Sequence, residues 1–214
     1  MTAMARPRRS DGAVTRRRVL DAAVSTVLEL GYYRASSNEI ARRAGVTWGT
    51  IQHQFRTRQA LLLEVLNDRW DEFQAAMARA TIRGATLEER LTAVLDVLAE
   101  HYGSPLHLVQ LQILLDLGQD PDTSDEVRQR IHEHGARLVR AWQPLFDQAL
   151  GEAALPTLVR YTFLTMRGFL AGELISSRVA HVPATAELRR LLVTGIASTI
   201  RAEAATRQLP IEGD

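Results

Sequence analysis

The chain has 214 residues, 46% of them hydrophobic and 24% charged, which is enough for one or two domains with a substantial core. It contains no cysteine, and all 26 of its basic residues are arginine, so disulfides, cysteine-ligated metals, a P-loop lysine and lysine nucleophiles are excluded. The net charge of +1 hides an asymmetry, because residues 1–58 carry +7 and residues 59–214 carry −6. The N-terminal part is therefore suited to a polyanion such as DNA.

Residues 1–12 are polar and include Arg6, Arg8 and Arg9. We expect a flexible basic arm, which is either a solvated tail or an arm that reaches into the minor groove or along the phosphates of DNA. A first helix is predicted over residues 14–30, with Gly31 as its stop. Since charged residues interrupt the apolar segments of the chain, we expect no signal peptide, no membrane contact and a cytoplasmic protein.

Residues 35–58 predict two short helices joined by a tight turn. Ser36 or Ser37 can cap the first helix by accepting a backbone N–H bond. Gly45 ends that helix, because glycine reaches positive φ without steric cost and can reverse the chain within three residues. The sequence therefore predicts a helix-turn-helix, with a three-helix DNA-binding domain over residues 13–58.

The second helix of this pair has one apolar and one polar side. Thr47 caps it, and Ile51 and Phe55 lie four residues apart on the face that we expect to be buried. Helices of this kind enter the major groove, whose width matches that of a helix. We expect the residues on its other faces to point towards DNA: Trp48, Gly49, Thr50, Gln52 and His53.

The segment from Gly31 to Leu66 resembles the DNA-binding domain of the TetR (tetracycline-repressor-like) family of bacterial transcriptional regulators, and the match extends from about Arg16. Two positions depart from the family pattern. Gln52 stands where a DNA-contacting tyrosine is usual, and Arg58 stands where a phosphate-binding lysine is usual. The resemblance rests on residues at the family's spacing: Gly31, Ser36-Ser37, Ile40-Ala41, Gly45-Val46, Gly49-Thr50, Phe55 and Leu61.

These observations assign roles to individual residues. Gln52 can read adenine with two hydrogen bonds, and Thr50 offers a methyl group to thymine. Trp48 either contacts DNA or packs on the protein. We expect phosphate contacts from Ser36, Ser37 and Arg58, and we expect the side chains that face the groove to be Thr47, Trp48, Thr50, Gln52 and His53, with Gly49 among them.

The remainder of the chain predicts helices only, so the expected fold class is all-α. Thr57 caps a long helix that runs to about residue 80, and residues 59–214 form a helical domain that binds an effector and mediates dimerisation, as the resemblance implies. Further helices are predicted over residues 86–102, 105–117, 124–150, 155–178 and 185–206, separated by glycine- or proline-containing segments.

No catalytic or metal-binding motif emerges from this helical half. His132 and His134 lie two residues apart, so on a helix they point roughly 200° from each other and cannot bind one metal ion. Gly-x-Ser-x-Gly and His-Glu-x-x-His are absent. We therefore expect no enzyme activity, no cofactor and no metal.

The resemblance implies a small apolar or amphipathic effector bound between helices. Arg167 stands inside an apolar stretch and either meets this ligand or forms an ion pair with Glu173. The candidate ligand-binding residues are Trp70, Phe73, His107, Gln110, Leu111, Leu114, Trp142, Phe163 and Arg167.

The last two helices carry glycines where a second helix could approach closely, either in a partner subunit or within one chain. A homodimer is favoured, because one helix-turn-helix grips little DNA and two-fold symmetry matches a palindromic operator. The candidate interface residues are Gly168, Gly172, Leu188, Leu192, Gly195 and Thr199.

The leading functional hypothesis is a ligand-responsive, dimeric transcriptional regulator, most simply a repressor that leaves double-stranded operator DNA when an effector binds. One alternative is an enzyme in the helical half with an accessory DNA-binding domain. Another is a DNA-packing protein without an effector, under which the acidic C-terminal half would have no role.

Overall fold

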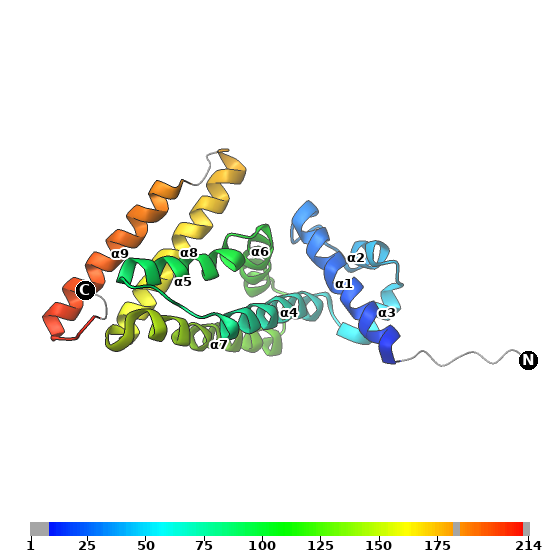
Figure 1. Cartoon of the computed structure of the whole chain (residues 1–214). Coiled ribbons are helices and arrows are strands. Elements are labelled where there is room, and N and C mark those ends of the chain that lie inside the picture. The colour runs from blue at the N-terminus through cyan, green and yellow to red at the C-terminus, as the bar shows by residue number, and fades with distance from the viewer. Residues whose placement is uncertain (1–8, 182–184, 212–214) are drawn as a thin grey trace, which may run out of the picture. The chain divides into compact units, whose positions relative to one another are not determined.

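The computed structural model describes residues 9–181 and 185–211, and the regular secondary structure of these residues is entirely helical (Figure 1). The all-α prediction is confirmed. The helices are α1 (Arg9–Leu30), α2 (Ser37–Ala44), α3 (Trp48–Phe55), α4 (Arg58–Arg79), α5 (Leu87–Tyr102), α6 (Pro105–Gln119), α7 (Asp125–Leu150), the 3₁₀ turn η1 (Gly151–Ala153), α8 (Pro156–Val179) and α9 (Ala186–Arg207).

Side-chain caps start most of the helices where the sequence predicts. The hydroxyl oxygens of Ser36, Thr47 and Thr185 each accept a bond from the backbone N–H three residues ahead. Thr86 forms a reciprocal capping box with Glu89, whose carboxylate accepts from the Thr86 amide. Each cap satisfies an N–H group that the first helical turn would otherwise leave unbonded. Because the cap and this N–H group lie three residues apart, the start of each of these helices can be predicted from a short stretch of sequence.

Two predicted boundaries differ from the structure. Helix α1 begins at Arg9, so residues 9–12 belong to a helix and not to the predicted flexible arm, whose residues 1–8 lie outside the described residues. Gly118, expected to follow a helix, lies inside α6, since a single glycine costs a helix only about 1 kcal/mol.

The chain forms two compact units. The first contains residues up to 71 together with residues 108–134, and the second contains residues 72–107 and 135–214. The sequence predicts a different division, with DNA binding in residues 13–58 and effector binding in residues 59–214. That functional division stays a prediction. The first compact unit contains α1, α2 and α3, together with the first part of α4, most of α6 and the first part of α7.

Each unit has an apolar core of its own. In the first unit, Val19, Ile40, Ile51 and Leu61 are fully buried and come from α1, α2, α3 and α4. In the second, Leu91, Phe146, Phe163 and Ile200 come from α5, α7, α8 and α9. Burying side chains of this size stabilises the folded state by about 1.5–3 kcal/mol each, which holds the short helices α2 and α3 in place.

A substitution at Gly45 tests how much the turn between α2 and α3 contributes to stability. Its φ of 64° lies in the left-handed region, and an added Cβ would lie 2.8 Å from Arg18 Nη2. Gly45→Ala is therefore expected to lower the free energy of unfolding by about 1–2 kcal/mol in urea denaturation. Gly49→Ala is the control, because its Cβ would lie at an ordinary 3.7 Å from Thr47 Oγ1 inside α3. Equal losses in the two variants would contradict the role of the turn.

Candidate nucleic-acid interface

The turn at Gly45 sets the direction of α3. The Gly45 N–H bonds back to the carbonyls of Ala41 and Arg42, and the Val46 N–H donates to the Ala41 carbonyl at 3.0 Å. Ile51 and Phe55 of α3 are buried beneath the turn. Because these two residues point into the core, the other side of α3 faces away from it.

That outward side contains most of the residues predicted to face DNA. Thr47, Gly49, Gln52 and His53 are exposed, whereas Trp48 and Thr50 are half-buried. Ser36 is exposed and Ser37 half-buried at the start of α2. The structure therefore brings the predicted groove-facing residues together on one exposed surface of the first unit.

Two of the predicted contacts are also helix caps. Ser36 Oγ accepts from the Glu39 N–H at 3.2 Å, and Thr47 Oγ1 accepts from the Thr50 N–H at 3.3 Å while lying 3.1 Å from Thr50 Oγ1. Since capping uses the oxygen as an acceptor, the Ser36 hydroxyl hydrogen is available for a phosphate. A Ser36 substitution would therefore affect both the helix start and DNA binding.

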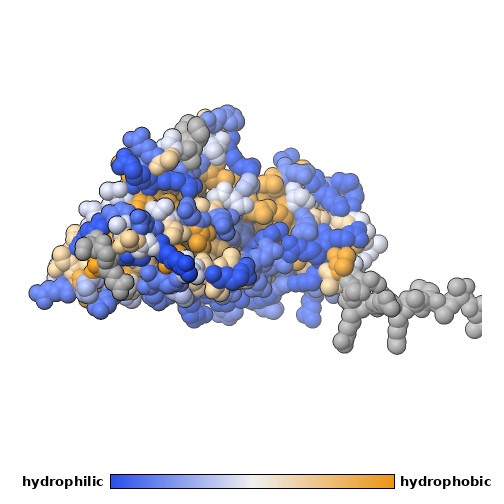
Figure 2. Space-filling view, in the orientation of Figure 1, coloured by the Kyte–Doolittle hydropathy of each residue, from blue (hydrophilic) through white to orange (hydrophobic). Residues whose placement is uncertain are grey.

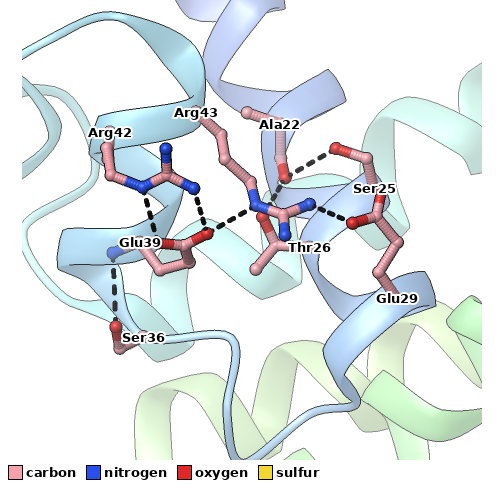
Figure 3. Close-up of polar contacts among 8 residues, drawn as sticks. All are labelled: Ala22, Ser25, Thr26, Glu29, Ser36, Glu39, Arg42 and Arg43. Carbon is pink, nitrogen blue, oxygen red and sulfur yellow. Dashed lines mark hydrogen bonds and ion pairs between the residues drawn. The ribbon is translucent and has the colours of Figure 1, made fainter.

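The two arginines of α2 share one carboxylate (Figure 3). Glu39 accepts from Arg42 Nε at 2.9 Å and from Arg43 Nε at 2.7 Å, while Arg43 Nη1 also bonds Glu29 at 2.6 Å. The hydrogen bonds from Arg42, and then those from Arg43, lower the pKa of Glu39 to about 2. Glu39 thus stays ionised and orients both guanidinium groups, while the Arg42 side chain remains 70% exposed.

In the sequence, Arg42 and Arg43 count towards the positive surplus of residues 1–58. Their spacing from Glu39, three and four residues along a helix, is the local signal that would have revealed the pairing. The arginines of this surface are therefore partly neutralised.

The Arg58 side chain, predicted to contact a phosphate, instead binds carbonyl groups of its own chain. Its Nε donates to the Ala35 carbonyl at 2.9 Å, and its Nη2 donates to the Tyr32 carbonyl. The guanidinium carbon lies 4.2 Å from the centroid of the Tyr32 ring, and the side chain is only 17% exposed. An arginine has five donors in a planar fork, so its Nε and Nη2 can each bind a different carbonyl in a fixed geometry. Arg58 therefore joins α4 to the loop before α2.

Asp120, in the turn between α6 and α7, completes this arrangement. Its carboxylate accepts from the Tyr32 hydroxyl at 2.9 Å and from the Asp122 N–H at 2.9 Å, and it lies 3.8 Å from Arg58 Nη1. Burial works to raise the pKa of Asp120, but these bonds, with one from Gln59 and the Arg58 charge, lower it overall. One carboxylate thus links the turn between α6 and α7 to Tyr32, Gln59 and Arg58 within the first unit, and no local pattern in the sequence indicated this role.

The predicted ligand-binding residues are divided between the two units. Trp70, Gln110, Leu111 and Leu114 belong to the first. Five others belong to the second, and of these Phe73, His107, Trp142 and Phe163 are buried, whereas Arg167 is half-buried.

In the second unit these residues join an aromatic cluster. Tyr102 lies 5.5 Å from Phe73, 4.8 Å from His107 and 5.7 Å from Phe163 between ring centroids. Trp142 stacks on Phe163. The structure thus brings four of the predicted ligand-binding side chains together around one tyrosine that the sequence analysis had left out of its candidate set.

The ion pair considered between Arg167 and Glu173 does not form. Glu173 instead accepts from Arg189 of α9 at 3.5 Å, and the Arg167 guanidinium lies 5.6 Å from the Tyr102 ring centroid. Residues six apart on a helix lie on different sides of it, which explains the separation.

The glycines predicted at the dimer interface face open space within the chain. A Cβ added at Gly168, Gly172 or Gly195 would meet no atom within 4 Å, so packing inside one subunit does not explain them. Leu188 is 47% exposed, and Leu192 and Thr199 are half-buried. Figure 2 shows apolar residues at the surface among mainly hydrophilic ones.

The described part of the chain has neither a metal-binding cluster nor a membrane-spanning helix. Residues 9–181 and 185–211 contain no group of three or more His, Asp or Glu side chains that could hold a metal ion. Across the same ranges, every helix is too short or too polar to cross a membrane.

The Asp120 network generates a prediction about stability. Since the folded state lowers the pKa of Asp120, its stabilising effect is present above the unfolded pKa of about 3.9 and is lost as the pH falls through the folded value. Asp120→Asn should lower the free energy of unfolding by about 1–3 kcal/mol at pH 7, and by less at acid pH. Urea denaturation between pH 7 and pH 3 measures both effects.

Asp116→Asn, one turn earlier on α6, is the matched control, because its carboxylate lies outside this network. If both variants lose the same stability at every pH, the network has no special role.

The N-terminal part of the chain is similar to known regulatory proteins. Residues 19–65 match the family model described as bacterial regulatory proteins, tetR family. The chain is 29% identical over 136 residues to the fatty acid metabolism regulator protein of Bacillus subtilis (strain 168), which covers 63% of this chain and 65% of that protein. The chain thus spans less than two thirds of the length of this curated relative.

Solved structures share the fold over most of the chain. A transcriptional regulator (RHA1_ro04179) from Rhodococcus sp. Rha1 has a TM-score of 0.66 at 17% identity, covering 88% of this chain and 96% of that one. The transcriptional regulator FadR from Bacillus subtilis, in complex with stearoyl-CoA, has a TM-score of 0.62 at 19% identity, covering 86% and 96%. The part of the chain that matches the tetR family model, residues 19–65, is the segment that contains the helix-turn-helix.

Proposed function

We propose that this protein is a ligand-responsive, dimeric transcriptional regulator of the cytoplasm, and specifically a repressor that binds a palindromic operator. The observation that carries the proposal is the exposed side of α3, where Gln52 and His53 point away from a core formed by Ile51 and Phe55. A helix held in this way fits the major groove. The relative and the structural neighbours are regulators, which favours this role over an enzyme.

On DNA, the exposed residues divide into two kinds of contact. Gln52 and Thr50 read base edges, with Thr47, Trp48, Gly49 and His53 beside them. Ser36 and Ser37 bind phosphates, which fixes the position of α3 without reading sequence. Arg58 supports the interface through the Tyr32 and Ala35 carbonyls.

Dimerisation uses the exposed side of α8 and α9. The open positions of Gly168, Gly172 and Gly195 allow the helices of a second copy to approach closely. Leu164, Leu188 and Leu191, which are each about half exposed, supply the apolar area for such an interface. Two reading helices are then presented to the two halves of a palindrome.

The effector binds in the helical half and stabilises an arrangement that does not fit DNA. A ligand that binds this arrangement about 100-fold more tightly weakens operator binding by about 3 kcal/mol. The FadR neighbour was solved with stearoyl-CoA, which supports an amphipathic small molecule as the effector of this fold.

DNA binding is tested by gel shift on the DNA upstream of the gene. The purified protein should bind this DNA with an affinity that falls steeply as salt rises, since phosphate contacts release counterions. Equal binding to unrelated DNA of the same length at every salt concentration would contradict an operator-specific regulator.

Base reading by Gln52 is tested by substitution. Gln52→Ala should change the preferred base at one operator position, by about 1–3 kcal/mol of discrimination. Ser37→Ala is the comparison, because loss of a phosphate contact should weaken all sequences alike. Selection of bound sequences from a random DNA pool measures both, and an unchanged preference for Gln52→Ala would show that Gln52 only positions the helix.

The dimer surface is tested by a larger side chain at a position where the isolated subunit has room for it. Gly172→Leu should leave the subunit folded, since the added side chain points into open space, but should block the approach of a partner helix. Sedimentation equilibrium should show a dimer become a monomer. Gly118→Leu is the control, because its Cβ also meets no atom within 4 Å, but it lies on α6. A Gly172→Leu protein that stays dimeric would place the interface elsewhere.

A further inference from the structure

Beside His107, the aromatic cluster of the second unit contains three side chains that can donate hydrogen bonds. Tyr102 ends α5, Trp142 lies in α7, and Arg167 lies in α8. We call these three residues the donor group. Phe73 packs against Tyr102, and Phe163 packs against both Tyr102 and Trp142, so these two rings give the group apolar walls.

Two members of the donor group are buried without a hydrogen-bond partner. Tyr102 is 1% exposed and Trp142 is 5% exposed. Among the described residues, neither the Tyr102 hydroxyl nor Trp142 Nε1 meets a partner at full hydrogen-bonding geometry, although the Trp142 N–H lies near enough to the Tyr102 oxygen to favour its anionic form. Leaving a donor unbonded in a protein interior costs about 1–3 kcal/mol, so two of them beside one another indicate a place where a further group is bound.

The third member brings a positive charge. Arg167 is half-buried, its guanidinium lies over the Tyr102 ring, and no carboxylate of the described residues pairs with it. Burial raises the pKa of Tyr102, whereas the Arg167 charge and the Trp142 N–H both favour its anionic form. A negative charge near the Tyr102 oxygen is therefore stabilised by two different side chains.

We propose that the effector site recognises an anion, specifically a carboxylate or similar oxygen acceptor on a flat or acyl skeleton. The acceptor oxygens receive bonds from Tyr102, Trp142 and Arg167, and the apolar skeleton lies against Phe73 and Phe163. A cation of the same shape is rejected, because it would offer no acceptor and would meet the Arg167 charge. The anion site itself does not depend on the proposed function. Only the description of the bound anion as an effector rests on the proposal that the protein is a regulator.

Direct binding tests the inference without DNA. The full-length protein is titrated with dodecanoate and with 2-naphthoate, and then with the cations of the same skeletons, dodecylammonium and 2-naphthylmethylammonium. Isothermal titration calorimetry reports the dissociation constants. At least one anion should bind more than about tenfold more tightly than its matched cation. Equal or tighter binding of the cations overturns the inference, as does the failure of both anions to bind at about 1 mM.

Two arginine variants separate a specific contact from a general charge effect. Arg167→Gln should weaken anion binding by about 10- to 100-fold and remove the preference over the cation. Arg160→Gln removes the same charge from an exposed position of α8 and should change neither. Tyr102→Phe should weaken anion binding by less, because it removes a neutral donor. A preference that survives Arg167→Gln contradicts the assignment.

A gel shift on the upstream DNA separates this inference from the proposed function. If the anions bind but never release DNA, the anion site stands and the effector role fails. If DNA is released by the cations and not by the anions, the regulator stands and the anion site fails.

Discussion

The left-handed turn at Gly45 is the constraint on which the interface depends. Only a residue without Cβ adopts a φ of 64° at no cost, and this conformation lets the Val46 N–H bond to the Ala41 carbonyl. With the turn closed, Ile51 and Phe55 enter the core and Gln52 and His53 face outwards. The exposed surface that we propose to read DNA thus depends on the backbone geometry of this turn before it depends on side-chain chemistry.

The arginines around this turn serve the fold as well as the charge. Arg18 donates to the Ala44 carbonyl at 2.6 Å, Arg58 donates to two loop carbonyls, and Arg42 and Arg43 share Glu39. A guanidinium presents its donors in a fixed plane and stays charged even when partly buried, whereas the pKa of a buried lysine shifts readily. In a chain without lysine, the positive surplus of residues 1–58 therefore includes several structural groups.

The second unit has two features that a self-contained helical bundle does not need. Its open glycines on α8 and α9 leave room for another helix, and its buried donor group is unsatisfied within the described residues. One feature fits a second copy of the chain and the other fits a small anion. A regulator needs both, since dimerisation presents two reading helices and ligand binding changes their fit to DNA.

Local signals in the sequence were sufficient for the helices, the caps at Ser36 and Thr47 and the turn at Gly45, because each acts within about four residues. The tertiary structure decided the rest: Arg58 binds the Tyr32 and Ala35 carbonyls beside Asp120, Glu173 pairs with Arg189, and Tyr102 gathers Trp142 and Arg167. These partners lie far apart along the chain. No spacing rule connects them, because only the packing of whole helices brings them within bonding distance.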